Sequence, residues 1–291
     1  MDSSTFQGFT KLSISNCIRP NWRVSSRVCA LITTRDGGVS CGKYGMLKNQ
    51  KCVPGGLNLG LHTGDNIDAV RENRRRVISL VGAHVAWLKQ VHGTCVVRAD
   101  KVINRDFLTA DASVTNRSKI VCAILVADCI PILICDEDGS AIGAVHGGWR
   151  GLIGGVIQNT VDSVRSLIPS SRRAGNSLHA YLGPSIGPSV FEVGEEVRTS
   201  FLEASWPDER DATNAAFIAL TGCVNNTIDV YSDSQYKYLA NLGELARIRL
   251  ARVGVHYVSG PHACTFSDPS RFYSYRRDHT TGRMAALIWL T

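Results

Sequence analysis

Three side chains that can bind a soft or borderline metal ion stand at the ends of predicted β-strands. They are His92 after Ala86–Val91, Cys129 between the apolar segments Ile120–Ala127 and Ile130–Cys135, and His146 after Ala141–Val145. Sites in α/β folds gather at strand ends, so we expect these side chains to converge. Two imidazoles, one thiolate and a free fourth position are typical of catalytic zinc. The residue types therefore predict a zinc site, in which copper could substitute.

Each of these residues also has a purely structural interpretation. A histidine at a strand end is often held by structural hydrogen bonds, and a cysteine within an apolar run usually packs in the core. The intervals of 37 and 17 residues match no short metal-binding motif. Asp128 and Pro131 favour a site, because a charge and a proline that interrupt a buried strand are costly without a function.

The segment that follows His146 indicates an anion pocket. It reads His146-Gly147-Gly148-Trp149-Arg150-Gly151, with two glycines immediately before a predicted helix. Glycines allow close approach of the backbone, and the N-terminal amides of a helix favour an anion. The alternative is that the glycines only allow a strand and a helix to pack tightly together.

The elements that must position these residues alternate between strands and helices. The predicted strands are Val28–Thr34, Val85–Val91, Thr94–Arg98, Ala112–Thr115, Ile120–Ala127, Ile130–Cys135, Ala141–Val145 (after a turn at Asp138-Gly139), Leu178–Leu182, and segments near 255–258, 272–275 and 284–290. The predicted helices run from Asp65 or Asn66 to Gly82, over Ile153–Ile168, and near 194–204 and 233–253. The Gly-rich stretch 35–64 is predicted to be a long loop. No compositional break appears, so we expect one mixed α/β domain over residues 28–291.

Composition limits the class of protein. The 291 residues are 44% hydrophobic and 20% charged, which excludes a disordered chain, and no apolar run is long enough for a membrane span. The net charge of +7 is dispersed, so we expect small anionic substrates and no nucleic acid. Ten cysteines without a C-x-x-C pair indicate reduced, mostly buried thiols in a cytoplasmic compartment.

Residues 1–27 have a different character. They are rich in serine and contain Lys11, Arg19, Arg23 and Arg27 but one acidic residue, a composition typical of an organellar transit peptide. They lack the apolar core of a secretory signal. We expect a poorly ordered N-terminus in a cytoplasmic protein, with organellar import through residues 1–27 as the alternative.

Many motifs, in the same order along the chain, resemble the YfiH family, which is also called the laccase-domain, polyphenol oxidase or peptidoglycan editing factor family. They include Leu57-Asn58-Leu59-Gly60-Leu61-His62, Lys89-Gln90-Val91-His92-Gly93, Ala127-Asp128-Cys129, the hexapeptide His146–Gly151, and Thr281-Gly282-Arg283-Met284-Ala285. The resemblance extends from about Arg19 to Thr291. Gly147 replaces the usual alanine, and the stretch between Ser40 and Leu57 is longer than in most members.

The resemblance implies a layered α/β/α/β sandwich with mixed sheets, and its metal ligands map onto His92, Cys129 and His146. It implies phosphorolysis of adenosine, inosine or methylthioadenosine, with adenosine deamination as a side activity, by a monomer or homodimer. Asp111 and Asp128 would transfer protons or hold a histidine tautomer. The candidates for binding substrate or phosphate are Arg35, Asn58, His62, Gln90, Arg150, Arg276 and Arg283.

Three other interpretations stay open. A multicopper oxidase is not among them, because it needs many histidines, usually in H-x-H pairs, and this chain has eight histidines and no such pair. A single copper ion in the zinc site would still give a weak phenol oxidase. A hydrolase that edits a peptidoglycan precursor could use Cys129 as nucleophile and His146 as base. A partner protein without enzymatic activity would hold the metal only for structure.

Overall fold

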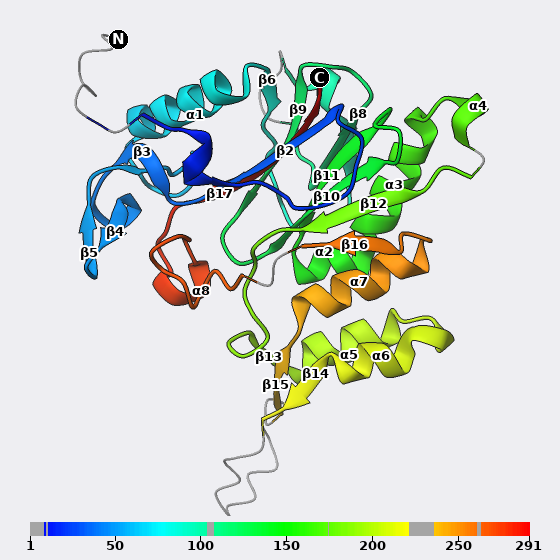
Figure 1. Ribbon diagram of the computed structural model, residues 1–291. Helices are drawn as coiled ribbons and strands as arrows, with labels where there is room; N and C mark the ends of the chain where they lie inside the picture. Colours follow the sequence, from blue (N-terminus) through cyan, green and yellow to red (C-terminus); the bar gives the residue numbers. More distant parts are fainter. Residues whose placement is uncertain (1–8, 10, 104–107, 174, 221–235, 261–262) are drawn as a thin grey trace, which may run out of the picture.

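Two large β-sheets form the centre of the molecule (Figure 1). The computed structural model describes residues 9, 11–103, 108–173, 175–220, 236–260 and 263–291. The five-stranded sheet has the order β1 (Cys17–Ile18), β2 (Val28–Thr33), β17 (Met284–Leu290), β9 (Ile120–Val126) and β6 (His84–Ala86). The six-stranded sheet has the order β16 (Tyr257–Ser259), β12 (Leu178–Leu182), β10 (Ile130–Asp136), β11 (Ile142–Gly147), β8 (Ala112–Thr115) and β7 (Val96–Arg98).

The central strands are apolar on both sides because both of their faces are covered. Along β9, Cys122 and Ile124 point toward the six-stranded sheet, whereas Val121 and Ala123 belong to the cluster on the other face. Side chains of a strand alternate between the two faces of its sheet, so a strand buried on both faces needs an unbroken apolar sequence. This explains the continuous run Ile120–Ala127.

Helix α1 (Ile67–Val81) covers the outer face of the five-stranded sheet, where Val77 is fully buried. The side chain of Asn66 caps its N-terminus by accepting hydrogen bonds from the amides of Asp68 and Ala69. Gly82 ends the helix with φ 61°, a left-handed conformation that suits glycine. The predicted helix between Asn66 and Gly82 is confirmed.

Helices α2 (Trp149–Gly154), α3 (Val156–Leu167) and α7 (Leu242–Arg252) cover the other face of the six-stranded sheet, and α4 (Ser170–Arg173) follows α3. The layers therefore run from α1 through the five-stranded and six-stranded sheets to α2, α3 and α7. The two large sheets are direct neighbours, with no helix layer between them. The structure confirms the mixed, layered α/β class, but the layers of the main body follow the order α/β/β/α and not the α/β/α/β order that the resemblance implied, because the two sheets pack directly on each other.

A smaller unit extends from this body at the bottom of Figure 1. It contains β13 (Glu192–Gly194), β15 (Lys237–Ala240), β14 (Phe217–Ala219), α5 (Glu195–Glu203) and α6 (Arg210–Ala215). The buried carboxylate of Glu209, in the 3₁₀ turn η5 (Pro207–Glu209), pairs with Arg249 and Arg252 of α7. This charged cluster joins the smaller unit to the main body.

The prediction of a long loop over residues 35–64 is wrong. The segment contains β3 (Asp36–Ser40), η3 (Gly42–Tyr44) and a hairpin of β4 (Met46–Lys48) and β5 (Lys51–Val53). Polar residues and glycines form these strands because hydrogen bonds to backbone and side chains hold them, not a buried apolar face. The amide of Val39, for example, donates to the side chain of Asn73 on α1 at 2.8 Å.

Four further predictions of secondary structure need correction. The strand predicted over Val85–Val91 is limited to β6, because the chain leaves the sheet after Ala86. The helix predicted over Ile153–Ile168 is two helices, since Gly155 has φ 94° and separates α2 from α3. Of the helix predicted near 233–253, residues 233–235 lie outside the described residues, and the described part is shorter because β15 precedes α7. No strand forms over 272–275, where residues 272–274 are irregular and the short helix α8 (Tyr275–Asp278) begins at Tyr275.

The described part of the N-terminal stretch belongs to the fold. After η2 (Ile14–Asn16), Cys17 and Ile18 pair with β2, Leu12 is buried in the core, and the ring of Trp22 contacts that of Tyr181 edge-on. The folded body thus begins before residue 28, unlike the expected poorly ordered residues 1–27. Organellar import stays a prediction.

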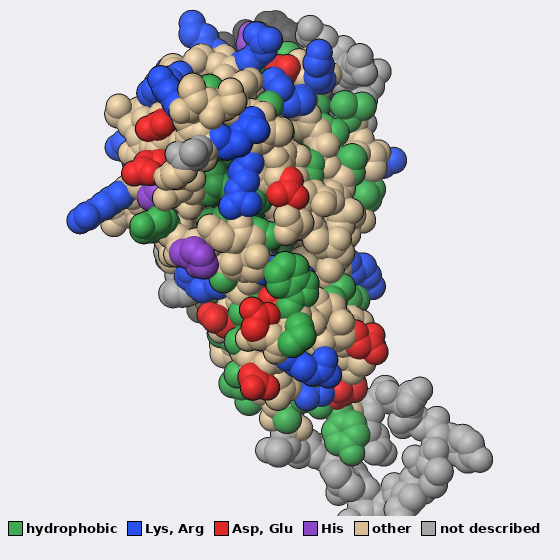
Figure 2. All heavy atoms as spheres, turned by 90° about the vertical axis from the view of Figure 1, so that its right-hand side faces the viewer, with side chains coloured by type: hydrophobic (Ala, Val, Ile, Leu, Met, Phe, Trp, Pro, Cys, Tyr) green, Lys and Arg blue, Asp and Glu red, His purple; other side chains and the backbone are tan. Residues whose placement is uncertain are grey.

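The cysteines differ from the expectation of buried thiols. The nine cysteines that the structure describes are free, but Cys41, Cys52 and Cys95 are exposed, and Cys122 and Cys135 are the fully buried ones. Cys223 lies outside the described residues. Across the described residues we find no helix of the length and apolarity that a membrane span requires. On the face shown in Figure 2, Lys and Arg side chains are scattered over the upper body and form no single stripe.

Candidate metal centre

The side chains of His92, Cys129 and His146 converge on one point. Their candidate ligand atoms all lie within 4.8 Å of one another, although the residues come from three separate segments. Cys129 Sγ is 3.6 Å from His92 Nε2, and the two imidazole rings are 4.7 Å apart, edge to face. Across the described ranges, no other three histidine, cysteine or acidic side chains approach closely enough to hold a metal ion.

The separation between Cys129 Sγ and His92 Nε2 fits two ligands of a tetrahedral metal ion. With Zn–S near 2.3 Å and Zn–N near 2.0–2.1 Å, two ligands at a tetrahedral angle lie about 3.6 Å apart. The measured distance from Cys129 Sγ to His92 Nε2 has this value. One imidazole is exposed and the other is buried, so the fourth position can be open to a small molecule.

Unusual backbone conformations aim two of these side chains inward. His92 has φ 60° in the loop after β6, and Asp128, directly before Cys129, has φ 98° in the connection between β9 and β10. Such angles are strained for residues other than glycine and persist where the surroundings fix them. His146 lies on β11 opposite Pro131 of β10, so the sheet itself positions it.

Asp111 fixes both histidines through one fully buried carboxylate. Its Oδ1 accepts hydrogen bonds from His146 Nδ1 at 2.8 Å and from the amide of His92 at 2.9 Å, while its Oδ2 accepts from the amide of Gly93 at 2.7 Å. Because a carboxylate only accepts, His146 keeps a proton on Nδ1, so Nε2 is the ring nitrogen that can bind a metal ion once it loses its own proton. Burial alone would raise the pKa of Asp111, but these hydrogen bonds lower it.

The protein groups alone form a thiolate–imidazolium pair. Burial tends to raise the pKa of Cys129, but the charge of His146 and hydrogen bonds from both histidines outweigh it and lower the pKa to about 6. Burial tends to lower the pKa of His146, but Cys129 and Asp111 raise it to about 9. Cys129 is therefore a thiolate at neutral pH, the form that binds metals.

Gly148 forms one wall of this centre. A Cβ atom at Gly148 would lie 2.7 Å from His92 Cδ2 and 3.4 Å from Cys129 Sγ. Its φ of −71° is ordinary, so the need for glycine here is one of space and not of conformation. The short helix α2 begins directly after it, which agrees with the prediction of a helix just beyond Gly147-Gly148.

Asp128 is held beside the centre by partners from distant parts of the chain. Its Oδ1 accepts from Thr265 Oγ1 at 2.6 Å, and its Oδ2 accepts from the amide of Arg276 at 2.7 Å. The amide of Ile186 donates to its backbone carbonyl at 2.9 Å. No sequence signal identified Thr265, because it is not adjacent to a predicted site residue.

Arg283 is the predicted cation that the structure brings toward the triad. Burial lowers its pKa, while the nearby Cys129 and Asp128 raise it, so its guanidinium lies within electrostatic reach of both. Its Nη1 donates to the carbonyls of Thr281 and Gly282, and its other two nitrogens have no hydrogen-bond partner among the described residues. Burial, Arg283 and Arg74 lower the pKa of the exposed His62, which places His62 beside Arg283.

Three other residues that were predicted to bind substrate or phosphate form hydrogen bonds within the protein instead. Arg35 is buried and donates to the carbonyls of Gly45 and Pro269. Asn58 holds its own loop through Thr63, Asp65, Gly60 and the amide of Arg283. Gln90 exchanges two hydrogen bonds with the backbone of Leu125 and so fastens the His92 loop to β9.

The remaining two arginine candidates have different neighbours. Arg150 is exposed on α2 and lies over the ring of Trp149 at 4.2 Å. The backbone amide of Arg276 donates a hydrogen bond to Asp128, but its guanidinium donates to the carbonyl of Glu192. Substrate binding by Arg35, Asn58, Gln90, Arg150 and Arg276 stays a prediction.

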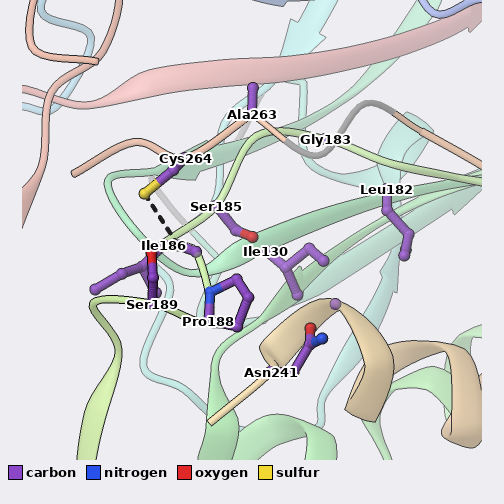
Figure 3. Close-up of a pocket in the computed structure, with 12 residues that line it drawn as sticks. Ile130, Leu182, Gly183, Ser185, Ile186, Pro188, Ser189, Asn241, Ala263 and Cys264 are labelled. Atoms are coloured by element: carbon purple, nitrogen blue, oxygen red, sulfur yellow. Dashed lines mark hydrogen bonds between the residues drawn. The ribbon is translucent and has the colours of Figure 1, made fainter. Parts of the chain in front are cut away.

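A cavity of about 210 Å³ lies between the start of β10, the loop 183–189 and the N-terminal end of α7 (Figure 3). Its apolar walls include Ile130 and Ile186, and its polar groups include Asn241 and Cys264, whose Sγ accepts a hydrogen bond from the amide of Gly187. Among the described residues, no charged side chain lines it, and none of the predicted site residues does. The cavity is therefore distinct from the metal centre, although Ile130 directly follows Cys129.

The fold and the site together define the class of protein: a layered α/β protein in which two histidines and a cysteine could hold a single metal ion. Residues 29–291 match the family described as multi-copper polyphenol oxidoreductase laccase, and the chain belongs to this family. The family resemblance inferred from the motifs is thereby confirmed. A trinuclear copper cluster has no ligand set among the described residues, where the triad is the one metal-binding group.

Similar proteins carry the name purine nucleoside phosphorylase. The chain is 42% identical over 273 residues to such a protein from Pseudomonas aeruginosa, covering 94% of this chain and 98% of the relative. It is 40% identical to purine nucleoside phosphorylase YfiH of Escherichia coli K12, covering 95% and 100%. A crystal structure of Neisseria meningitidis protein NMB0706 matches with a TM-score of 0.78 and 41% identity, covering 94% and 99%.

Proposed function

We propose that this protein is a zinc-dependent purine nucleoside phosphorylase. It would convert adenosine, inosine or methylthioadenosine and phosphate into the free base and a pentose 1-phosphate, with adenosine deamination as a side activity. The observation that carries the proposal is the convergence of His92, Cys129 and His146 beside the guanidinium of Arg283. The names of the similar proteins support the same activity.

The three ligand side chains would hold the zinc ion. They fit it because the ligand atoms gather within 4.8 Å, because Cys129 Sγ and His92 Nε2 have the separation of two tetrahedral ligands, and because the pKa of Cys129 is lowered toward the thiolate. A bound zinc ion supplies Lewis acidity, which polarises a substrate oxygen or a water molecule. The carboxylate of Asp111 supports the site by keeping the proton of His146 on Nδ1.

The remaining residues would bind the anion and manage protons. In phosphorolysis a phosphate oxygen forms a bond to C1′ of the pentose, and the bond from C1′ to the base nitrogen breaks with its electron pair leaving on the base. Arg283 would hold the phosphate, since two of its nitrogens have no partner among the described residues. Asp128, fixed by Thr265 and Arg276, would orient the reacting groups or transfer a proton.

The direct test is to incubate the purified protein with adenosine and phosphate and to measure adenine and ribose 1-phosphate. We expect the loss of at least about 100-fold in rate for His92→Ala and for Cys129→Ala. The matched controls are His84→Ala and Cys52→Ala, because both residues are exposed and lie outside the triad. Full activity in either triad variant would contradict the proposal.

The second candidate is a hydrolase that edits a peptidoglycan precursor. The pKa of about 6 for Cys129, with His146 beside it, favours this alternative because a thiolate paired with an imidazole is a nucleophile. Such an enzyme would not need a metal ion. Activity of the metal-free protein on a muramyl precursor, lost in Cys129→Ala, would support the hydrolase and contradict the phosphorylase.

A copper-loaded phenol oxidase is the remaining alternative. The family description favours copper, and copper binds most nitrogen and sulfur sites more tightly than zinc. We propose that any oxidase activity belongs to copper that has replaced zinc at the same triad. Phenol oxidation that survives Cys129→Ala would place that activity at another site.

A further inference from the structure

Two exposed apolar side chains flank the metal centre. Val91, next to His92, is 51% exposed, and Tyr275, at the start of α8, is 54% exposed. The backbone of Val91 is fixed because its amide donates to Asp111. The metal ligands and Arg283 account for the polar chemistry of the site, but they leave the function of these apolar side chains unexplained.

The fold fixes Tyr275 one residue away from a backbone contact with Asp128. The next residue, Arg276, donates its amide to Asp128 at 2.7 Å, and Asp128 directly precedes Cys129. The fully buried Ser274 caps α8 by accepting a hydrogen bond from the amide of Arg277. Figure 1 shows α8 at the end of the five-stranded sheet where β17 begins, and β17 pairs there with the end of β9.

The ring of Tyr275 is directed by its neighbours but is not covered by them. The guanidinium carbon of Arg283 lies 5.8 Å from the ring centre. The ring of His279 meets it edge-on at 6.3 Å and 76°. Because more than half of the side chain stays exposed, aromatic surface remains available beside the cation that would hold phosphate.

We propose that Tyr275 is the surface on which the purine base of the substrate stacks. A purine is flat and uncharged, so an aromatic side chain suits its face better than an ionic group does. Stacking on an aromatic side chain contributes substantially to the binding of a single base. This inference rests on the proposed function, since it assigns the base of the nucleoside to the side of the site formed by α8.

Steady-state kinetics with Tyr275→Leu and Tyr275→Phe test the assignment. We expect Tyr275→Leu to raise the KM for adenosine about 5- to 150-fold, with the KM for phosphate unchanged within about twofold. Tyr275→Phe should keep the KM of the wild type, because it keeps the ring. Tyr257→Leu is the matched control, since Tyr257 is an exposed tyrosine on the edge strand β16, outside the site. An unchanged adenosine KM in Tyr275→Leu would overturn the inference.

Binding of free adenine, measured by equilibrium dialysis, separates this inference from the proposed function because it needs no turnover. We expect the wild-type protein and Tyr275→Phe to bind adenine equally and Tyr275→Leu to bind it at least about fivefold more weakly. Binding that depends on Tyr275 in a protein without phosphorolysis would support the stacking surface and contradict the phosphorylase. Equal binding by Tyr275→Leu, or no binding by the wild type, would overturn the stacking surface even if the phosphorylase is active.

Discussion

Replacing Asp111 by asparagine tests how the fold organises the metal centre. The carboxylate is fully buried and accepts hydrogen bonds from His146 Nδ1 and from the amides of Val91, His92 and Gly93. Asparagine has nearly the same shape, but it replaces one accepting oxygen by an NH₂ group that would face other N–H groups. The variant therefore loses charge-assisted hydrogen bonds and gains an unsatisfied buried donor.

The magnitude follows from these contacts. A hydrogen bond to a charged group contributes about 1.5–3 kcal/mol, and breaking a buried charged network costs about 3–5 kcal/mol. We expect Asp111→Asn to lower the free energy of unfolding by about 3–5 kcal/mol in a denaturant titration. Because the tautomer of His146 is no longer fixed, zinc affinity should fall about 10- to 100-fold in a competition assay with a chelator.

Asp136→Asn is the matched control for Asp111→Asn. Asp136 is also fully buried, and it accepts hydrogen bonds from the amides of Ser140 and Ala141 at 2.6 Å. It lies six residues along β10 from Ile130, about 20 Å from the metal centre. We expect a comparable loss of stability with unchanged zinc affinity. Equal zinc affinity in Asp111→Asn and the wild type would refute the role of Asp111.

Three other perturbations have distinct expected results. Gly148→Ala should weaken zinc binding at least about tenfold in chelator competition with little change in stability, because the new Cβ would displace His92, 2.7 Å away; unchanged affinity would contradict the packing argument. Arg35→Gln should cost about 2–4 kcal/mol of unfolding free energy, because its buried guanidinium donates to backbone carbonyls, and should leave the phosphate KM unchanged; a raised KM would return Arg35 to the anion site. Burial tends to raise the pKa of Glu72, but hydrogen bonds from two arginines outweigh it and lower the pKa. The stabilisation by Glu72 is therefore complete above its ordinary pKa of 4.5 and is lost as the pH falls through the lowered value. The difference in unfolding free energy between the wild type and Glu72→Gln should shrink over that acidic range in denaturant titrations, and a constant difference would refute this.

The sequence predicted elements whose apolar pattern and end signals agree. Helix α1 has a capping asparagine, a helical apolar period and a terminal glycine, and strands such as β9 have unbroken apolar runs. The stretch 35–64 was misjudged because hydrogen bonds to distant residues, such as Asn73, stabilise its strands. Gly155 separates α2 from α3 through a left-handed conformation that an apolar period does not reveal.

The candidate site was predictable by residue type but not by arrangement. The strand ends indicated His92, Cys129 and His146, and the structure brings them together. The arginines could not be ranked from the sequence, because Arg35 and Arg283 both stand in motifs and only the tertiary contacts separate them. The sequence indicated Gly148 as a point of close approach, but the structure was needed to show that it makes space for His92 and Cys129. Thr265 escaped notice because its importance depends on a contact between segments far apart in the chain.

Zinc-edge X-ray absorption on the zinc-loaded protein tests the central claim most directly. We expect one zinc ion per chain with one sulfur at about 2.3 Å, two imidazole nitrogens at about 2.0–2.1 Å and one exchangeable light atom. The sulfur signal should disappear in Cys129→Ser and persist in Cys52→Ser, a change at an exposed thiol outside the triad. A zinc spectrum without sulfur, or one that is unchanged in Cys129→Ser, would contradict the account.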